Sequence, residues 1–65
     1  MPISDNIKKY RKKAGLSQDK LAKLADITHT TLVKLESGAN SNPTVKTLSK
    51  IAKALNVTID TLIKE

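Results

Sequence analysis

The segment from Leu16 to Gly38, LSQDKLAKLADITHTTLVKLESG, constrains the fold more than any other part of this chain. Apolar residues recur at helical spacing in two short runs, separated by Asp26 and Ile27. Aspartate tolerates the left-handed backbone that a sharp corner between helices often requires. The segment therefore predicts two short helices, over residues 18–25 and 29–37, joined by a tight turn.

The rest of the chain also predicts helices only. A first helix ends at Gly15, a fourth covers residues 45–55 and stops at Asn56, and a short fifth helix holds the last apolar residues. A serine or threonine that can accept a backbone hydrogen bond precedes each of the five, and each such cap contributes about 1 kcal/mol. These predicted caps are Ser4, Ser17, Thr28, Thr44 and Thr58.

The predicted core is aliphatic, because Tyr10 is the only aromatic residue among the 65 residues. A chain of this length has room for one small core, so we expect one all-α domain of five helices spanning residues 1–65. The residues expected to face this core are Ile3, Ile7, Tyr10, Ala14, Leu21, Ala22, Leu24, Ala25, Leu32, Leu35, Val45, Leu48, Ile51, Ala52, Leu55, Ile59 and Leu62.

The charge is strongly basic, with a formal net charge of +6 and a pI near 9.9. Such an excess favours a polyanion such as nucleic acid as the partner. A solvated face that keeps a small protein soluble is the alternative for most of the cations. Five cations crowd the first helix: Lys8, Lys9, Arg11, Lys12 and Lys13. Because they wrap around that helix, they cannot all reach one duplex.

Several classes of protein are disfavoured by what the sequence lacks. It has no cysteine and one histidine, and its carboxylates show no metal-ligand spacing. Its two glycines stand far apart, so no glycine-rich phosphate loop is formed. We therefore expect neither an enzyme nor a cofactor. No apolar run approaches the roughly 20 residues of a membrane span, and MPISDNIKK lacks the apolar core of a signal peptide, so the expected location is the cytoplasm.

The outer face of helix 29–37 is polar and has no evident role in the fold. Successive residues of a helix rotate by about 100°, which places Leu32 and Leu35 together on the core side. Any amphipathic helix has a solvated polar face, so this feature alone is weak evidence. The opposite arc nevertheless offers donors, acceptors and a methyl surface of the kind that contacts base edges. Its residues are His29, Thr30, Val33, Lys34 and Ser37.

The Leu16–Gly38 segment resembles the helix-turn-helix of the Cro and phage-repressor group of bacterial regulators, also called the Xre group. The resemblance extends to the basic first helix, IKKYRKKAGLSQ, and to the closing stretch TLSKIAKALNVTIDTL. It implies a compact, five-helix domain similar to that of lambda repressor. In such a domain the second and third helices form the helix-turn-helix, and the third enters the DNA major groove.

Roles for individual residues follow from this resemblance. His29, Thr30 and Lys34 match positions that face base edges, and Val33 is placed beside them by the helical geometry. Arg11 and Glu36 resemble a pair that joins the first and third helices, so we predict a partly buried salt bridge. Backbone contacts are expected from Arg11, Ser17, Gln18, Thr28, Thr31, Asn40, Ser41, Asn42 and Thr44.

Two departures from the family pattern concern DNA binding. The loop from Ala39 to Asn42 carries no charge, although the family uses this loop to contact phosphates. Asp26 stands where the family most often has glycine. The first departure weakens the expected phosphate contacts of the loop and leaves them to its asparagines, its serine and the backbone amides near Thr44.

Three hypotheses for function follow. The first is a transcriptional regulator that binds a palindromic operator, of the phage-repressor or restriction-modification-controller type. The second is an antitoxin that binds both DNA and a toxin protein, and the third is an interaction module that does not read DNA. We also expect a weak homodimer strengthened on DNA, with contacts from Val57, Ile59 and Ile63, because dimers read paired half-sites.

Overall fold

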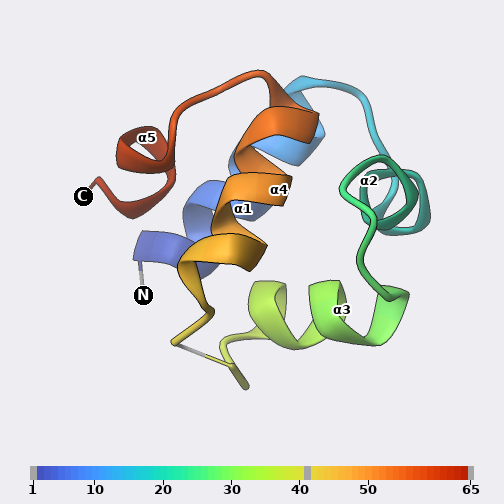
Figure 1. The fold of residues 1–65 in the computed structure, drawn as a ribbon. Helices are drawn as coiled ribbons and strands as arrows, with labels where there is room; N and C mark the ends of the chain where they lie inside the picture. Colours follow the sequence, from blue (N-terminus) through green and yellow to red (C-terminus); the bar gives the residue numbers. More distant parts are fainter. Residues whose placement is uncertain (1, 41, 65) are drawn as a thin grey trace.

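The computed structural model describes residues 2–40 and 42–64, and all the regular secondary structure in these ranges is helical (Figure 1). The predicted all-α fold is therefore confirmed, with helices close to their expected bounds. They are α1 (Pro2–Lys13), α2 (Gln18–Leu24), α3 (His29–Ser37), α4 (Val45–Leu55) and α5 (Ile59–Ile63).

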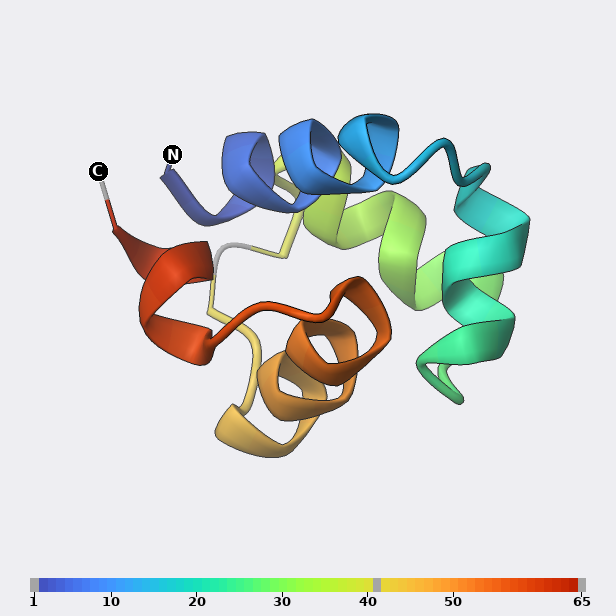
Figure 2. The same cartoon turned by 90° about the horizontal axis from the view of Figure 1, so that it is seen from above.

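The helices surround one core. Helix α1 packs against α3, α4 and α5, and α2 packs against α3 and α4. Figure 1 shows α4 crossing in front of α1, with α2 and α5 on opposite sides and α3 below. The view from above confirms that α2 and α5 lie at opposite ends of the molecule (Figure 2). None of the helices in the described ranges is long and apolar enough to cross a membrane.

Every helix contributes at least one fully buried side chain to this core. Burial of one such Leu or Ile side chain stabilises the fold by about 1.5–3 kcal/mol. Contributions from all five helices make their relative positions depend on one another. The largest fully buried side chains are Ile7, Leu21, Leu32, Leu35, Ile51 and Leu62.

Four of the five predicted caps are present, at the starts of α2 to α5. The Ser17 hydroxyl accepts a hydrogen bond from the Lys20 backbone N–H at 3.0 Å. At the other three helices a second threonine stands three residues after the cap, and the two hydroxyls also hydrogen-bond to each other. These pairs are Thr28–Thr31, Thr44–Thr47 and Thr58–Thr61, with oxygen–oxygen distances of 2.8, 3.0 and 2.9 Å.

The prediction that Ser4 caps the first helix is wrong, because α1 already begins at Pro2. Proline suits the first turn of a helix, where its missing N–H would have no partner within the helix. Ser4 instead lies inside α1 and is only 6% exposed. A Cβ atom on Gly38 would lie 3.8 Å from the Ser4 hydroxyl, so Ser4 is buried where α1 meets the end of α3.

Leu24 and Val45 were expected in the core, but they are 55% and 72% exposed. The buried arc of α2 is centred between Leu21 and Ala22, which leaves Leu24 about 110° away around the helix. Val45 is the first residue of α4, and helical side chains tilt toward the N-terminus, beyond the turns that pack on the core. Ala14 is also exposed, because it lies past the end of α1.

Left-handed residues make the corners between helices. Asp26 has φ 56° and Asn56 has φ 60°, and the two glycines at the ends of α1 and α3 are also left-handed. The predicted left-handed corner at Asp26 is therefore present. Its carbonyl oxygen accepts a hydrogen bond from Lys50 Nζ at 3.5 Å, which connects α4 to this corner.

Two leucines of α2 test the position of the core. We expect Leu21→Ala to lower the free energy of unfolding by about 2–5 kcal/mol, because it leaves a cavity in a packed interior. Leu24→Ala should lower it by less than about 1 kcal/mol, because that side chain is already half exposed. Urea unfolding measures both. Equal losses for the two variants would contradict the packing described above.

Candidate nucleic-acid interface

The predicted ion pair between Arg11 of α1 and Glu36 of α3 is present. Arg11 Nε donates to Glu36 Oε2 at 2.7 Å, and Nη2 donates to Oε1 at 3.1 Å. The side chains are 12% and 2% exposed. Two parallel bonds between a guanidinium and a carboxylate hold both groups in a fixed orientation. This pair therefore sets the position of α3 relative to α1.

The Glu36 carboxylate also holds α2. Gln18 Nε2 donates to Glu36 Oε1 at 3.1 Å, and Arg11 Nη1 donates to the Leu16 carbonyl oxygen at 2.7 Å. We call these four groups the Glu36 network. Arg11 and Gln18 were both predicted to contact the DNA backbone, and these contacts remain predictions; within the protein, their nitrogen atoms donate to Glu36 and Leu16. These bonds join α2 and α3 to each other and to α1.

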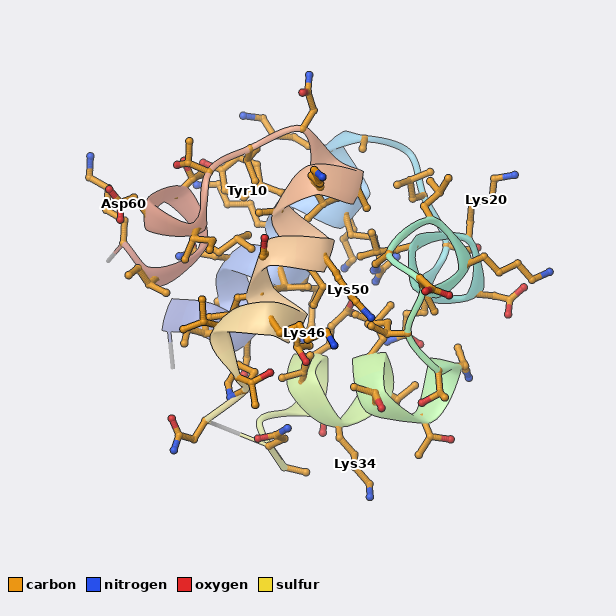
Figure 3. All side chains as sticks on the ribbon, in the orientation of Figure 1. Tyr10, Lys20, Lys34, Lys46, Lys50 and Asp60 are labelled. Atoms are coloured by element: carbon orange, nitrogen blue, oxygen red, sulfur yellow. The ribbon has the colours of Figure 1, made fainter. Side chains whose placement is uncertain are left out.

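The outer face of α3 is open to solvent. His29, Thr30 and Lys34 are exposed, Val33 is partly exposed, and Leu32 lies in the core, as their predicted arcs require. Figure 3 shows the Lys34 side chain extending away from the body of the protein. This arrangement leaves an imidazole, a hydroxyl, an ammonium group and a methyl surface free on one side of a short helix.

Several hydroxyls near α3 are used within the protein. Thr28 Oγ1 accepts from the Thr31 backbone N–H at 3.1 Å and is hydrogen-bonded to the Thr31 hydroxyl. Ser37 Oγ donates to the Lys34 carbonyl oxygen and accepts from the Ala39 N–H. Thr28 and Ser37 therefore hold the two ends of α3.

The loop after α3 folds back on that helix. The Asn40 N–H donates to the Lys34 carbonyl oxygen at 3.1 Å, and the Asn42 N–H donates to Asn40 Oδ1 at 3.1 Å. The Thr44 hydroxyl donates to Thr47 Oγ1. Ser41, a predicted backbone contact, lies outside the described residues. These two loop amides are thus engaged inside the protein, whereas the phosphate contacts expected from the backbone amides near Thr44 remain a prediction.

Acidic residues are scarce in the part of the chain that forms α3 and α4. From Ile27 to Ile59 the sequence holds one acidic residue, Glu36, and this residue is buried and paired with Arg11. Helices α3 and α4 have no acidic residue in the first turn. The start of α4 thus keeps a positive dipole end that favours anions, whereas the exposed Asp26 lies two residues before the Thr28 cap of α3. The first turns of the other three helices carry Asp5, Asp19 and Asp60.

Lys46 is a candidate contact that sequence reasoning missed. It is exposed on the first turn of α4, directly after the loop that follows α3 (Figure 3). Its position in the sequence, two residues after the Thr44 cap, is the signal that could have identified it as a phosphate contact. There it adds a cation to the positive end of the α4 dipole, next to a loop that carries no charge.

Comparison with known proteins decides the family. The family model described as helix-turn-helix matches residues 7–62. This chain belongs to the helix-turn-helix family. Among the family's curated members, the chain is similar to the HTH-type transcriptional regulator SinR of Bacillus licheniformis, with 35% identity over 63 residues. An uncharacterized HTH-type transcriptional regulator of Archaeoglobus fulgidus is 38% identical over 56 residues.

The coverage of these relatives is unequal. The alignment spans 97% of this chain but 57% of the length of B. licheniformis SinR, and SinR of Bacillus subtilis gives the same figures. For the A. fulgidus relative the shares are 86% and 79%. The likeness to SinR is therefore to part of a longer regulator.

Solved structures of the same family share the fold closely. SinR in complex with DNA superposes with a TM-score of 0.93 at 34% identity, covering 95% of this chain and 98% of that one. The complex of the SinR and SinI proteins also gives a TM-score of 0.93 at 35% identity, covering 97% of this chain and 61% of that one. The expected five-helix helix-turn-helix architecture is thus confirmed.

The predicted dimer residues differ in exposure. Val57 and Ile59 are partly buried and pack against the core, whereas Ile63 is 45% exposed. The structure therefore leaves Ile63 as the exposed apolar side chain of the three.

Replacing Glu36 by glutamine tests the Glu36 network. The change leaves the Arg11 charge buried without its counter-ion, and breaking a buried pair in this way costs about 3 kcal/mol or more. We therefore expect both the free energy of unfolding and the affinity for DNA to fall. Chemical unfolding and a gel shift measure the two.

The matched control is Asp19→Asn. Asp19 pairs with Lys23 at 3.5 Å, but both side chains are mostly exposed. Exposed pairs of this spacing contribute about 0.3–0.5 kcal/mol, so this variant should unfold almost as the wild type does. If Glu36→Gln changed neither stability nor affinity, the proposed role of the network would be wrong.

Proposed function

We propose that this chain binds double-stranded DNA in a sequence-specific way and regulates transcription, with α3 lying in the major groove of an operator. The single observation that carries the proposal is the geometry of α3. Its apolar side is buried and it is held at both ends, while its polar side is exposed beside an uncompensated helix start. The names of the relatives support the same function.

In this proposal His29, Thr30, Val33 and Lys34 contact base edges. Lysine donates to guanine O6 and N7, threonine bonds to several base edges, and a valine methyl group fits against a thymine methyl group. Phosphate contacts fall to Lys46 and to the exposed polar groups of Ser17, Thr28, Asn42 and Thr44. The side chains of Asn40 and Thr31 are secondary candidates, because each is partly buried and used within the protein.

The antitoxin hypothesis has less support. The relatives compared above are named as transcriptional regulators, and none of them is named as an antitoxin. The proposal therefore keeps DNA as the principal partner.

Selection of binding sites from random duplex DNA tests the proposed function. We expect enrichment of one short motif, and we expect its affinity to fall as salt rises, since each phosphate contact adds about −0.9 to the slope of log affinity against log salt. If no motif were enriched, or if binding did not respond to salt, the proposal would be wrong.

Lys34→Ala separates base contacts from phosphate contacts. We expect a loss of about 1–3 kcal/mol on the selected site and a relaxed preference at one base position, because a good base contact is worth that much. Lys46→Ala is the matched comparison, since it removes the same group from α4. It should weaken binding to all sequences alike and reduce the salt slope by about 0.9. Uniform loss for Lys34→Ala would instead make Lys34 a phosphate contact.

We further propose that two copies bind paired half-sites about 34 Å apart and meet weakly through Ile63. Ile63→Asp should abolish cooperative binding to a paired site while leaving the affinity for a half-site unchanged. Leu24→Asp is the matched control, because Leu24 is equally aliphatic and exposed but lies on α2, at the other end of the molecule (Figure 2). A strict monomer in sedimentation, both free and on a paired site, would contradict the dimer.

A further inference from the structure

A second basic surface lies where α1 meets α5. We define the α1–α5 patch as Lys9, Tyr10, Lys13 and Lys64. A pocket of about 230 Å³ opens here, lined by Asn6, Lys9, Tyr10, Thr61 and Lys64. None of the five described lining residues is acidic, although the exposed Asp5 and Asp60 stand one turn before Lys9 and Lys64 along the chain. The two salt bridges in the described part of the chain are Arg11–Glu36 and Lys23–Asp19, so neither involves a lysine of the patch.

The floor of the pocket is held rigidly. Asn6 Nδ2 donates to the carbonyl oxygens of Leu62 at 2.9 Å and of Lys64 at 2.6 Å. These bonds satisfy carbonyl groups at the end of α5 that have no partner within the helix. Asn6 thereby fixes α5 against α1 and keeps Lys64 on the same side as Lys9.

Two of the cations are arranged around the one aromatic ring. The ammonium groups of Lys9 and Lys13 each lie 5.5 Å from the centroid of the Tyr10 ring. A cation over an aromatic face at this distance is held by attraction to the ring. Since the ring is uncharged, both ammonium groups keep their full charge and can still bind an anion.

The patch does not belong to the α3 face. Figure 3 shows Tyr10 beside α5, whereas Lys34 extends from α3 on the other side of the molecule. We therefore expect a straight duplex held against α3 to leave the α1–α5 patch exposed. The basic charge of the chain is thus divided between two surfaces, and DNA binding through α3 uses only one of them.

We propose that the α1–α5 patch docks an acidic segment of a partner protein, in addition to the DNA-binding function. Lys9 and Lys13 stand about 6 Å apart along α1, at 1.5 Å of rise per residue. Alternate side chains of an extended peptide repeat at about 6.6–6.8 Å on one face. Carboxylates at every second position of an extended segment therefore match the two lysines, and Lys64 across the pocket takes a further carboxylate.

Titration of the labelled protein with a synthetic peptide of alternating glutamate and glycine tests this inference. Backbone amide chemical shifts at low salt should change most at Asn6, Lys9, Tyr10, Thr61 and Lys64, and a peptide with glutamine for glutamate should cause no change. Shift changes spread evenly over all the lysines would overturn the proposal, because they would show diffuse attraction only.

The double variant K9A/K64A provides a second measurement. It should weaken peptide binding about 2- to 25-fold, which is the effect of two exposed ion pairs. The matched control K20A/K53A removes the same charge from exposed lysines of α2 and α4 and should weaken binding less than 2-fold. Equal losses for the two variants would also overturn the proposal.

The same variants test whether DNA, and not a protein, binds the α1–α5 patch. The affinity of K9A/K64A for a DNA duplex should match that of K20A/K53A. A larger loss for K9A/K64A would make the patch a phosphate-binding surface and would overturn the proposal of a protein partner, while leaving the proposed DNA-binding function intact.

Discussion

The buried carboxylate of Glu36 is the interaction on which the rest of the structure depends. A carboxylate that is 2% exposed is costly unless strong partners surround it, and here Arg11 and Gln18 supply them from two other helices. The three helices cannot shift relative to one another without leaving that charge unpaired. The angle at which α3 presents its outer face is thus set by one ionic group beside the aliphatic core.

The same carboxylate also shapes the electric field of the protein. Because Glu36 is paired and buried, the long stretch from Ile27 to Ile59 presents no free acidic side chain. The start of α4 keeps its positive dipole end, and Lys34 and Lys46 add positive charge on α3 and α4. A chain with one aromatic residue and no cysteine thus combines a structural ion pair with an anion-attracting surface.

The sequence predicted local features well and features that depend on packing less well. The caps at Ser17, Thr28, Thr44 and Thr58 could be predicted because each needs only one hydroxyl and a neighbouring amide. The exposure of Leu24 and Val45 could not be predicted from the sequence, because it depends on where the neighbouring helices lie and end. The hydrogen bond from Gln18 to Glu36 is a third case, because it depends on where α3 places the Glu36 carboxylate, and the phosphate contact expected of Gln18 remains a prediction. Which side chains of α3 contact bases remains a prediction.

Amide chemical-shift mapping with a short DNA duplex tests the central claim, that α3 held by Glu36 is the element that binds DNA. We expect the largest shift changes at His29, Thr30 and Lys34 and at the first turn of α4, with little change at Thr61 and Lys64. Large changes on α5 with α3 unaffected would contradict it.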